Sequence, residues 1–314
     1  ALDRSGQSMS GFLQPGNYFE AGISILDPDV SGKEAGSSTT RRDIGDMAED
    51  YYFPSAVLKL QVADHFSFGL LYDQPFGAKA EYSGNNVFVS NPGTDSVLSA
   101  KAIDDIVTSR AEAALKAQNI PITDQTRAVA RAQVLASPQF QQLAGALTAA
   151  GGFLGRGATQ VEVDSQNLAF VFGFQPNQNW NFYAGPVYQT VKGNVKLRGQ
   201  AYSLYNGYDA NIKETSGVGW LAGLAYQIPD IALKTSLTYR SEIDHDVNID
   251  ENLSLLSFPA LTTVLSGLGV SGSQLAAINS NGKTTITTPQ SVNLDFQTGI
   301  MANTVAFANV RWVN

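Results

Sequence analysis

Hydrophobic and polar residues alternate with a period of two along nine stretches of the chain, which predicts nine β-strands. The stretches are Asn17–Val30, Tyr51–Val62, Phe66–Tyr82, Gln160–Gln175, Trp180–Arg198, Glu214–Ile228, Ile231–Asp246, Thr284–Ile300 and Thr304–Asn314. Most of them exceed the usual strand length of about 5–6 residues. Strands of this length are typical of sheets that cross a membrane at a tilt.

The connections between these strands alternate between short and long. The tight turns are Ala63–His65, Pro176–Asn179, Pro229-Asp230 and Ala302-Asn303. Bacterial outer-membrane barrels have short turns on the periplasmic side and long loops outside. We therefore expect an all-β fold, a transmembrane antiparallel β-barrel in the outer membrane of a Gram-negative bacterium. A soluble β-sandwich or solenoid is the alternative, and it leaves the asymmetry of the loops unexplained.

The alternation also predicts which side chains face lipid and which face the lumen. The outward set is Leu168, Phe170, Phe172, Phe174, Val218, Trp220, Leu224, Ile243, Leu294 and Phe296. The lumen set is Lys59, Lys192, Lys196, Lys234, Ser236, Thr238, Arg240, Glu242 and Arg311. An aromatic girdle near the short turns is expected from Phe66, Trp180, Tyr183 and Tyr226. The inner face of Glu214–Ile228 is mostly Gly and Ala, which indicates that another part of the chain fills that volume.

Two of the long loops are apolar. In the insertion 94–158, Ser99–Gln118 has helical spacing, and Ser137-Pro138 begins a second helix with Ser at the N-cap and Pro at N1. The loop 251–283 contains many leucines, up to Leu275 and Ile278. Four apolar loop residues are candidates for capturing a hydrophobic ligand: Phe140, Leu143, Phe258 and Leu261. The pattern leaves open whether these loops only pack on each other as a lid.

Composition narrows the class of protein further. Charged residues make up 15% of the chain, and its formal net charge is -8 with no basic cluster, which argues against a nucleic-acid partner. No run of about 18 apolar residues is present, so a membrane-spanning helix is not expected. The chain has no Cys, which suits an oxidising compartment.

The third strand contains an interruption at Asp73–Ala78. Pro75 cannot donate to a sheet ladder, and Gly77 permits a bend, so the pairing should break there. We interpret Asp73, Pro75, Phe76 and Gly77 as a kink that opens the wall of the barrel. An ordinary β-bulge is the alternative.

Four stretches resemble the FadL family of outer-membrane long-chain fatty-acid and hydrocarbon transporters. They are Leu26–Val30, Asp73–Ala78, Leu237–Ile243 and Thr285–Phe296, of which Tyr239–Glu242 is the most specific. The resemblance implies a barrel of about 14 strands with an N-terminal plug. It also implies passive uptake of long-chain fatty acids or similar hydrophobic compounds, captured at external loops and released laterally through the kinked third strand. Only nine strands are found here, so we expect a barrel that is incomplete at its C-terminus.

We expect residues 1–16 to form a short plug and residues 17–314 the barrel. A fatty acid needs a cation or donor cluster for its carboxylate and an apolar groove for its tail. Arg240 is the best candidate for the carboxylate, since its guanidinium can hold it with two hydrogen bonds, and Lys234 and Lys192 are further candidates. Phe12 and Leu13 in the plug are candidates for contact with the tail.

No catalytic residue, metal site or cofactor is expected, because the sequence has no G-x-S-x-G, metal-ligand spacing or Gly-rich phosphate loop. An outer-membrane lipase acting through His245 is the enzyme alternative. A hydrophilic or structural porin-like barrel is the alternative channel. The expected partners are hydrophobic small molecules, outer-membrane lipids and lipopolysaccharide, bound by a monomer.

Overall fold

The structure is a computed structural model that describes residues 7–35, 41–92, 94–269 and 281–314. Its strands are β1 (Tyr18–Leu26), β2 (Gly32–Lys33), β3 (Asp43–Ile44), β4 (Tyr51–Ala63), β5 (Phe66–Asp73), β6 (Gly77–Glu81), β7 (Gln160–Phe174), β8 (Trp180–Leu197), β9 (Tyr208–Ile228), β10 (Leu233–Arg240), β11 (Ile243–Leu253), β12 (Asn281–Thr288), β13 (Ser291–Met301) and β14 (Thr304–Val313). Its α-helices are α1 (Ala100–Ala117), α2 (Asp124–Ala136), α3 (Pro138–Ala150) and α4 (Leu261–Leu268). Within the described ranges, no helix combines the length and the apolar character needed to cross a bilayer.

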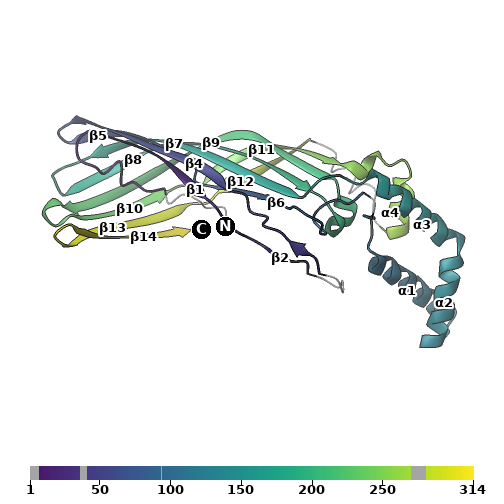
Figure 1. Cartoon of the computed structure of the whole chain (residues 1–314). Coiled ribbons are helices and arrows are strands. Elements are labelled where there is room, and N and C mark those ends of the chain that lie inside the picture. Colours follow the sequence, from purple (N-terminus) through teal and green to yellow (C-terminus); the bar gives the residue numbers. More distant parts are fainter. Residues whose placement is uncertain (1–6, 36–40, 93, 270–280) are drawn as a thin grey trace.

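Twelve of the strands form one antiparallel sheet that curves into a half-barrel, while β2 and β3 form a separate ribbon. The hydrogen-bonded order is β1-β4-β5-β7-β8-β9-β10-β13-β14. Three of the predicted strands are each interrupted once: β5 and β6 form one of them, β10 and β11 another, and β12 and β13 the third. With each of these pairs counted as one strand, the nine predicted strands are confirmed. The tight turns lie at one end and helices α1–α4 lie beyond the other (Figure 1), which confirms the asymmetry of the loops.

The two faces of the wall follow the predicted register in β7, β9 and β13. Phe172 is 59% exposed and Trp220 is 53% exposed, whereas Val171 and Leu221 between the outward positions are buried. In β13, Leu294 is exposed and Asn293 is buried. The convex face of the half-barrel therefore carries the apolar side chains, as predicted.

Three predictions about the register are wrong. Strand pairing breaks at Ser241 and Glu242, between β10 and β11, and the alternation reverses across this break, so Ile243 is buried and Glu242 is exposed. Tyr183 does not join the girdle, because its neighbour Phe182 points outward and Tyr183 points into the interior, where it is 3% exposed.

The third wrong prediction concerns Lys192, which was expected in the lumen. Lys192 shares the exposed register of β8 with Phe182 and Tyr188, whereas Val187, Gln189 and Val191 of the opposite register are buried. Since side chains alternate along a strand, Lys192 lies on the convex face, and so does Lys196.

Helices α1 and α3 begin where the sequence predicts. The side chains of Ser99 and Ser137 accept the N-cap hydrogen bonds from Ala102 and Phe140. Helix α2 was not predicted, because it has a single buried residue, Ala130, and so shows little apolar periodicity.

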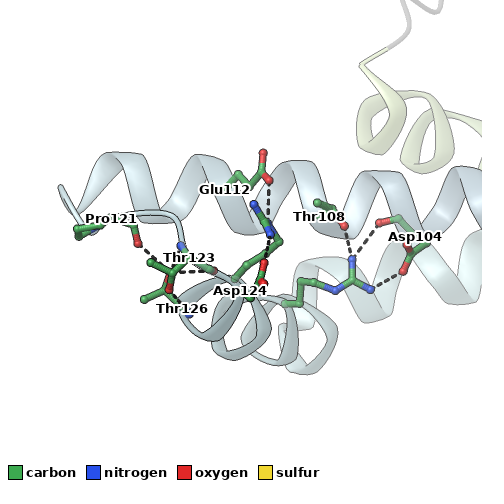
Figure 2. Close-up of polar contacts among 9 residues, drawn as sticks. Asp104, Thr108, Glu112, Pro121, Thr123, Asp124 and Thr126 are labelled. Atoms are coloured by element: carbon green, nitrogen blue, oxygen red, sulfur yellow. Dashed lines mark hydrogen bonds and ion pairs between the residues drawn. The ribbon is translucent and has the colours of Figure 1, made fainter.

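Helix α2 packs on α1 through a small apolar cluster of Ala111, Leu115 and Ala130 and through polar contacts. Thr123 and Thr126 form a capping box at its start, and its two arginines reach α1 (Figure 2). Arg127 bonds Glu112 at 3.0 Å, and Arg131 bonds Asp104 and Thr108. These exposed pairs orient the two helices rather than supplying much stability.

The two apolar loops pack against each other at the helical end of the half-barrel. This outer apolar cluster contains Val97, Leu143, Leu147, Ala150, Leu154, Leu253, Leu255, Phe258, Val264 and Leu265. Members from the insertion meet members from the described part of the loop 251–283, so the two loops pack on each other. Leu275 and Ile278 lie outside the described residues.

Candidate functional site

The N-terminal segment lies inside the half-barrel and fills its interior. Met9 and Phe12 are almost fully buried in a cluster with Leu71, Val171 and other wall residues. The ring of Phe12 meets Tyr183 edge-on, with 5.7 Å between centroids and 69° between planes. We call residues 7–16 the plug segment, and its apolar side chains occupy the space that a water-filled pore would need.

Glycines on the inner face create room for these rings. A Cβ added to Gly69 would lie 2.5 Å from Cδ2 of Phe12, and one added to Gly173 would lie 2.9 Å from its Cζ. A Cβ on Gly223 would lie 2.6 Å from the Tyr183 ring. On the inner face of β9, Leu221 and Ala225 share a cluster with the plug segment, Tyr183 fills the space at Gly223, and Ile243 fills the space at Gly217 and Gly219.

Three cations of the wall hold the plug segment through its oxygen atoms. Arg240 Nη2 donates to the carbonyl oxygen of Gln7 at 3.1 Å, and Arg311 Nη1 donates to Oε1 of the same residue at 3.1 Å. Lys59 Nζ donates to the carbonyl oxygen of Gln14. The cations predicted to face the lumen thus include the residues that anchor the plug.

Arg240 has an unusual environment for a charged group. It is 8% exposed, and its Nε is buried without a hydrogen-bond partner in the described structure. None of the ion pairs among the described residues includes it, although the carboxylates of Asp73 and Asp295 act on it electrostatically. Its main direct partner is the plug carbonyl, so its position depends on the plug and the plug depends on it.

Strand pairing breaks at Asp73–Ala78, where Gln74, Pro75 and Phe76 separate β5 from β6, and the register with β7 shifts between the pairs Asp73–Asn167 and Gly77–Asp164, as a β-bulge would also give. On the side of β7 the kink is closed: Phe76 donates to Oγ of Ser165 at 2.9 Å, and Ser165 donates to the carbonyl oxygen of Phe76 at 3.1 Å. The kink is therefore a defined break with satisfied backbone groups, and not an irregular loop.

On the side of β4 the ladder between β4 and β5 is interrupted. The β4–β5 ladder ends at the pair Ala56–Tyr72, and contact resumes only at Glu49–Lys79 and Ala48–Ala80. No ladder pair of the described residues joins 51–55 to 73–78. We call this stretch the seam. Pro54 of β4 and Pro75 lie on its two sides, and neither has an N–H group to donate.

A cavity of about 190 Å³ lies between the seam and the plug segment. Its lining includes Gln7, Ser10, Glu20, Ser55, Asp73 and Arg240. A second cavity of about 320 Å³ lies at the tight-turn end, where Leu13, Lys59 and Lys234 line it. The plug segment therefore has open space on both of its sides.

The predicted site residues fall into three groups. Arg240, Phe12, Asp73 and Phe76 lie at the plug and the seam, and Lys234 and Leu13 line the cavity at the tight-turn end. Leu143 and Phe258 belong to the outer apolar cluster and Leu261 packs against it, whereas Phe140 is buried on α3 outside this cluster. Lys192 lies on the convex face and joins none of these groups. Gln7, Ser165 and Pro54 were not identified from the sequence. Only Pro54 had a recognisable signal, because it is a proline in the predicted strand next to the one that contains Pro75.

His245, which the enzyme alternative requires, is fully buried in a polar chain. Its Nε2 lies 2.8 Å from Oε1 of Gln189, which also accepts from Thr288 at 2.8 Å, and Gln189 donates to Asn167 at 2.7 Å. Its partner at Nε2 is therefore an amide and not a serine. In the part of the chain that the structure describes, no group of three or more His, Asp or Glu side chains could hold a metal ion.

No family model matches the chain, and no curated protein matches its sequence. Among solved structures, the chain is similar to a FadL homologue of Pseudomonas aeruginosa, with 13% identity and a TM-score of 0.48 over 95% of this chain and 59% of that chain. It is similar to the P. putida toluene transporter TodX, with 11% identity and a TM-score of 0.48 over 99% and 64%. It is also similar to the Ralstonia pickettii toluene transporter TbuX, with 9% identity and a TM-score of 0.45 over 96% and 64%. The chain thus spans less than two thirds of the length of these proteins.

Proposed function

We propose that this chain forms the wall and plug of an outer-membrane channel for the passive uptake of hydrophobic compounds, either long-chain fatty acids or similar uncharged molecules. The observation that carries the proposal is the plug segment, since Met9 and Phe12 fill the interior of a half-barrel whose convex face is apolar. A hydrophilic porin needs an aqueous lumen instead.

The convex face supports a location in a membrane. Val218 and Trp220 of β9 are 70% and 53% exposed, and Phe172 of β7, on the other side of β8, is 59% exposed. A soluble protein rarely leaves such a continuous apolar surface in water. Outer-membrane lipids and lipopolysaccharide are the partners that we propose for this face, with the protein acting as a monomer.

The outer apolar cluster supports capture at the helical end. Leu143 of α3 is 3% exposed and Leu265 of α4 is 4% exposed, so a ligand reaches them only when α3 and α4 separate. The helices meet mainly through apolar side chains, and a hydrophobic ligand can replace such contacts without leaving a polar group unpaired.

The seam supports lateral release. A ligand that leaves between β4 and β5 enters the bilayer, whereas one that leaves through the tight-turn end enters water. Each CH₂ group moved into water costs about 0.8 kcal/mol, so the lateral route is favoured for a long alkyl chain. Asp73, Pro75, Phe76 and Gly77 form one side of this route. If the ligand is a fatty acid, we propose that its carboxylate binds Arg240 during uptake, and this role stays a prediction.

Reconstitution of the purified chain tests the proposal. Planar bilayers should show little ion conductance, because the plug segment fills the interior, and binding of dodecan-1-ol should saturate. High conductance to ions together with absent alkyl binding would favour the hydrophilic porin. Ester hydrolysis that is lost on replacing His245 would favour the lipase.

A further inference from the structure

We infer that the outer surface of the hydrocarbon layer meets the convex face along a sloping line, from Tyr52 in β4 to Val292 in β13, and that the seam opens at this surface. This inference rests on the proposed channel function. It specifies where the wall contacts lipid and at which depth a ligand leaves.

The outward side chains of six strands are largely apolar or aromatic from the tight-turn end up to a defined position. In β7 the run from Phe174 to Leu168 is followed by the exposed Gln166. The runs of β4, β5, β7, β8, β9 and β13 end at Tyr52, Tyr72, Leu168, Tyr188, Val218 and Val292. Two residues farther toward the helical end stand Asp50, Gln74, Gln166, Thr190, Ser216 and Gln290. Since the lipid-facing band of an outer-membrane barrel is apolar, these end points mark its outer edge.

The end points do not share one ladder row, that is, one set of residues paired across successive strands. One row contains Ala56, Tyr72, Leu168, Tyr188 and Val218. Tyr52 lies four residues beyond this row toward the helical end. Val292 lies on the row of Ala184, which is four residues before Tyr188 in β8. From β4 to β13 the line therefore drops by eight residues relative to the ladder.

Tilted strands produce a drop of this size. Neighbouring strands lie about 4.8 Å apart, and the strands of outer-membrane barrels tilt by about 35–45°. A flat membrane surface then shifts by roughly 1–1.5 residues per strand, or about 6–9 residues over the successive strands from β4 to β13. The observed drop lies within this range, so a single flat surface accounts for all the end points.

Three breaks between successive strands lie just outside the same line. The break between β5 and β6 begins at Gln74, the break between β10 and β11 begins at Ser241, and the break between β12 and β13 ends at Gln290. A lipid-exposed backbone group that loses its partner in hydrocarbon has no water to replace it, whereas at the membrane surface water is present. The positions of the breaks therefore support the line independently of side-chain polarity.

The seam straddles this outer surface. On its β4 side, Tyr52 is 66% exposed and its partner Ile25 in β1 is 65% exposed, so this side belongs to the apolar band. On its other side, Gln74 lies beyond the line and donates to the hydroxyl of Tyr72 at 3.1 Å. A ligand that leaves here can slide its alkyl chain into the outer leaflet while a polar end stays in the headgroup layer, which avoids burying that end in hydrocarbon.

Spin labels in lipid nanodiscs test the slope of the line, and the absence of Cys from the sequence allows single cysteines to be introduced directly. Phe182 and Leu294 share a ladder row, and both are 44% exposed. We expect a label at Phe182→Cys to lie about 10 Å deeper than a label at Leu294→Cys, because the line is four residues nearer to Leu294. The ratio of oxygen to nickel accessibility measures depth, and Lys192→Cys is the water-exposed control. Equal depths at positions 182 and 294 overturn the line.

Labels at Tyr52→Cys and Gln74→Cys test the level of the seam. The label at position 52 should favour oxygen, and the label at position 74 should be several-fold more accessible to the nickel complex. If the label at position 74 lies as deep as the label at position 182, the seam opens within the hydrocarbon, and the inferred level is wrong while the channel proposal stands. Water exposure at both positions 182 and 294 overturns the membrane location and, with it, the channel proposal.

Discussion

Arg240 of β10 and Gln7 of the plug segment are 233 residues apart in the sequence, and a hydrogen bond of 3.1 Å joins the guanidinium of the first to the backbone carbonyl of the second. Arg311 of β14 bonds the side chain of the same Gln7. Lys59 of β4 also bonds the plug, so strands from both halves of the chain fix it, and its apolar side chains cluster with Leu71, Val171 and Leu221, which also come from both halves. We therefore expect a substitution at Arg240 to loosen the plug segment more than it destabilises the wall.

Arg240→Met keeps the aliphatic stem and removes the charged donor. A hydrogen bond to a charged group contributes about 1.5–3 kcal/mol, so the plug should open roughly tenfold more often. The wall should keep its stability, because Met suits a buried site. Limited proteolysis at residues 7–16 measures plug opening, and cleavage at the parent rate would contradict the anchoring role. Fatty-acid binding by the same variant tests the predicted carboxylate role, and unchanged binding would exclude it.

Phe12→Ala should empty the centre of the interior cluster. Phe12 is fully buried against Tyr183, and Phe→Ala changes in protein cores cost about 3–5 kcal/mol. We expect a lower free energy of unfolding in detergent, together with ion conductance that the parent chain lacks. Leu13→Ala is the control, since Leu13 is half-buried and lies at the edge of the cluster. Equal losses for both variants would show that the ring does not fill the interior as described.

Much of the wall could be predicted from the sequence, because alternation over long strands depends only on which face is buried. The register of β7, β9 and β13 follows this pattern. The prediction for Ile243 and Glu242 was wrong because the break at Ser241 reverses the alternation, and neither Gly nor Pro marks that position on its own strand. The break on the partner strand does carry a signal, Pro289, which lies between β12 and β13.

Less of the candidate site than of the wall could be predicted from the sequence. The kink at Pro75 is a local property of one residue, so it could be predicted. Arg240 and Lys59 bond backbone carbonyl groups of the plug segment. Because every residue has a backbone carbonyl group, the sequence of the plug segment does not indicate these contacts. Helix α2 was missed because its apolar contact with α1 is small, with Ala130 as its one buried residue.

The register itself can be measured with spin labels. Cysteine substitutions at Phe172 and Ser236 place one label on the exposed face of β7 and one on the buried face of β10. In lipid nanodiscs, oxygen should broaden the label at position 172 several-fold more than the label at position 236. The reverse order would mean that the faces are inverted and that the membrane location is wrong.

The loop around Glu34 should respond to pH. Burial alone would raise the pKa of Glu34, but hydrogen bonds from the backbone N–H groups of Arg42 and Val87 and from the Arg42 side chain lower it overall. A lowered pKa in the folded state contributes stability above the ordinary glutamate value of about 4.3, and this contribution is lost as the pH falls through the lower folded value.

Thermal unfolding of the parent chain and of Glu34→Gln at several pH values measures this contribution. The parent should be the more stable of the two at pH 7, and the difference should shrink as the pH falls below about 4. Lys33→Gln, at an exposed neighbouring position, is the control. The stability difference between this variant and the parent should stay constant over the same pH range. A constant difference between Glu34→Gln and the parent across the range would contradict the assignment.

The last prediction concerns the exit at the seam, where the β4–β5 ladder is interrupted and each strand carries a proline, Pro54 or Pro75. Each proline lacks the N–H group that a ladder requires, so the two strands can stay apart without leaving an unpaired donor at either position. Replacing both prolines by Thr restores the donors and favours strand pairing, since Thr suits β-structure. The seam should close, and transfer of long-chain ligands into the bilayer should slow at least tenfold, while binding at the outer apolar cluster stays intact. Pro186→Thr in β8, away from the seam, is the matched control. Backbone amide exchange shows whether residues 51–55 and 73–78 have become protected. If they are protected and transfer continues at the parent rate, ligands do not leave through the seam, and the cavity lined by Leu13 and Lys234 at the tight-turn end becomes the better candidate for the exit.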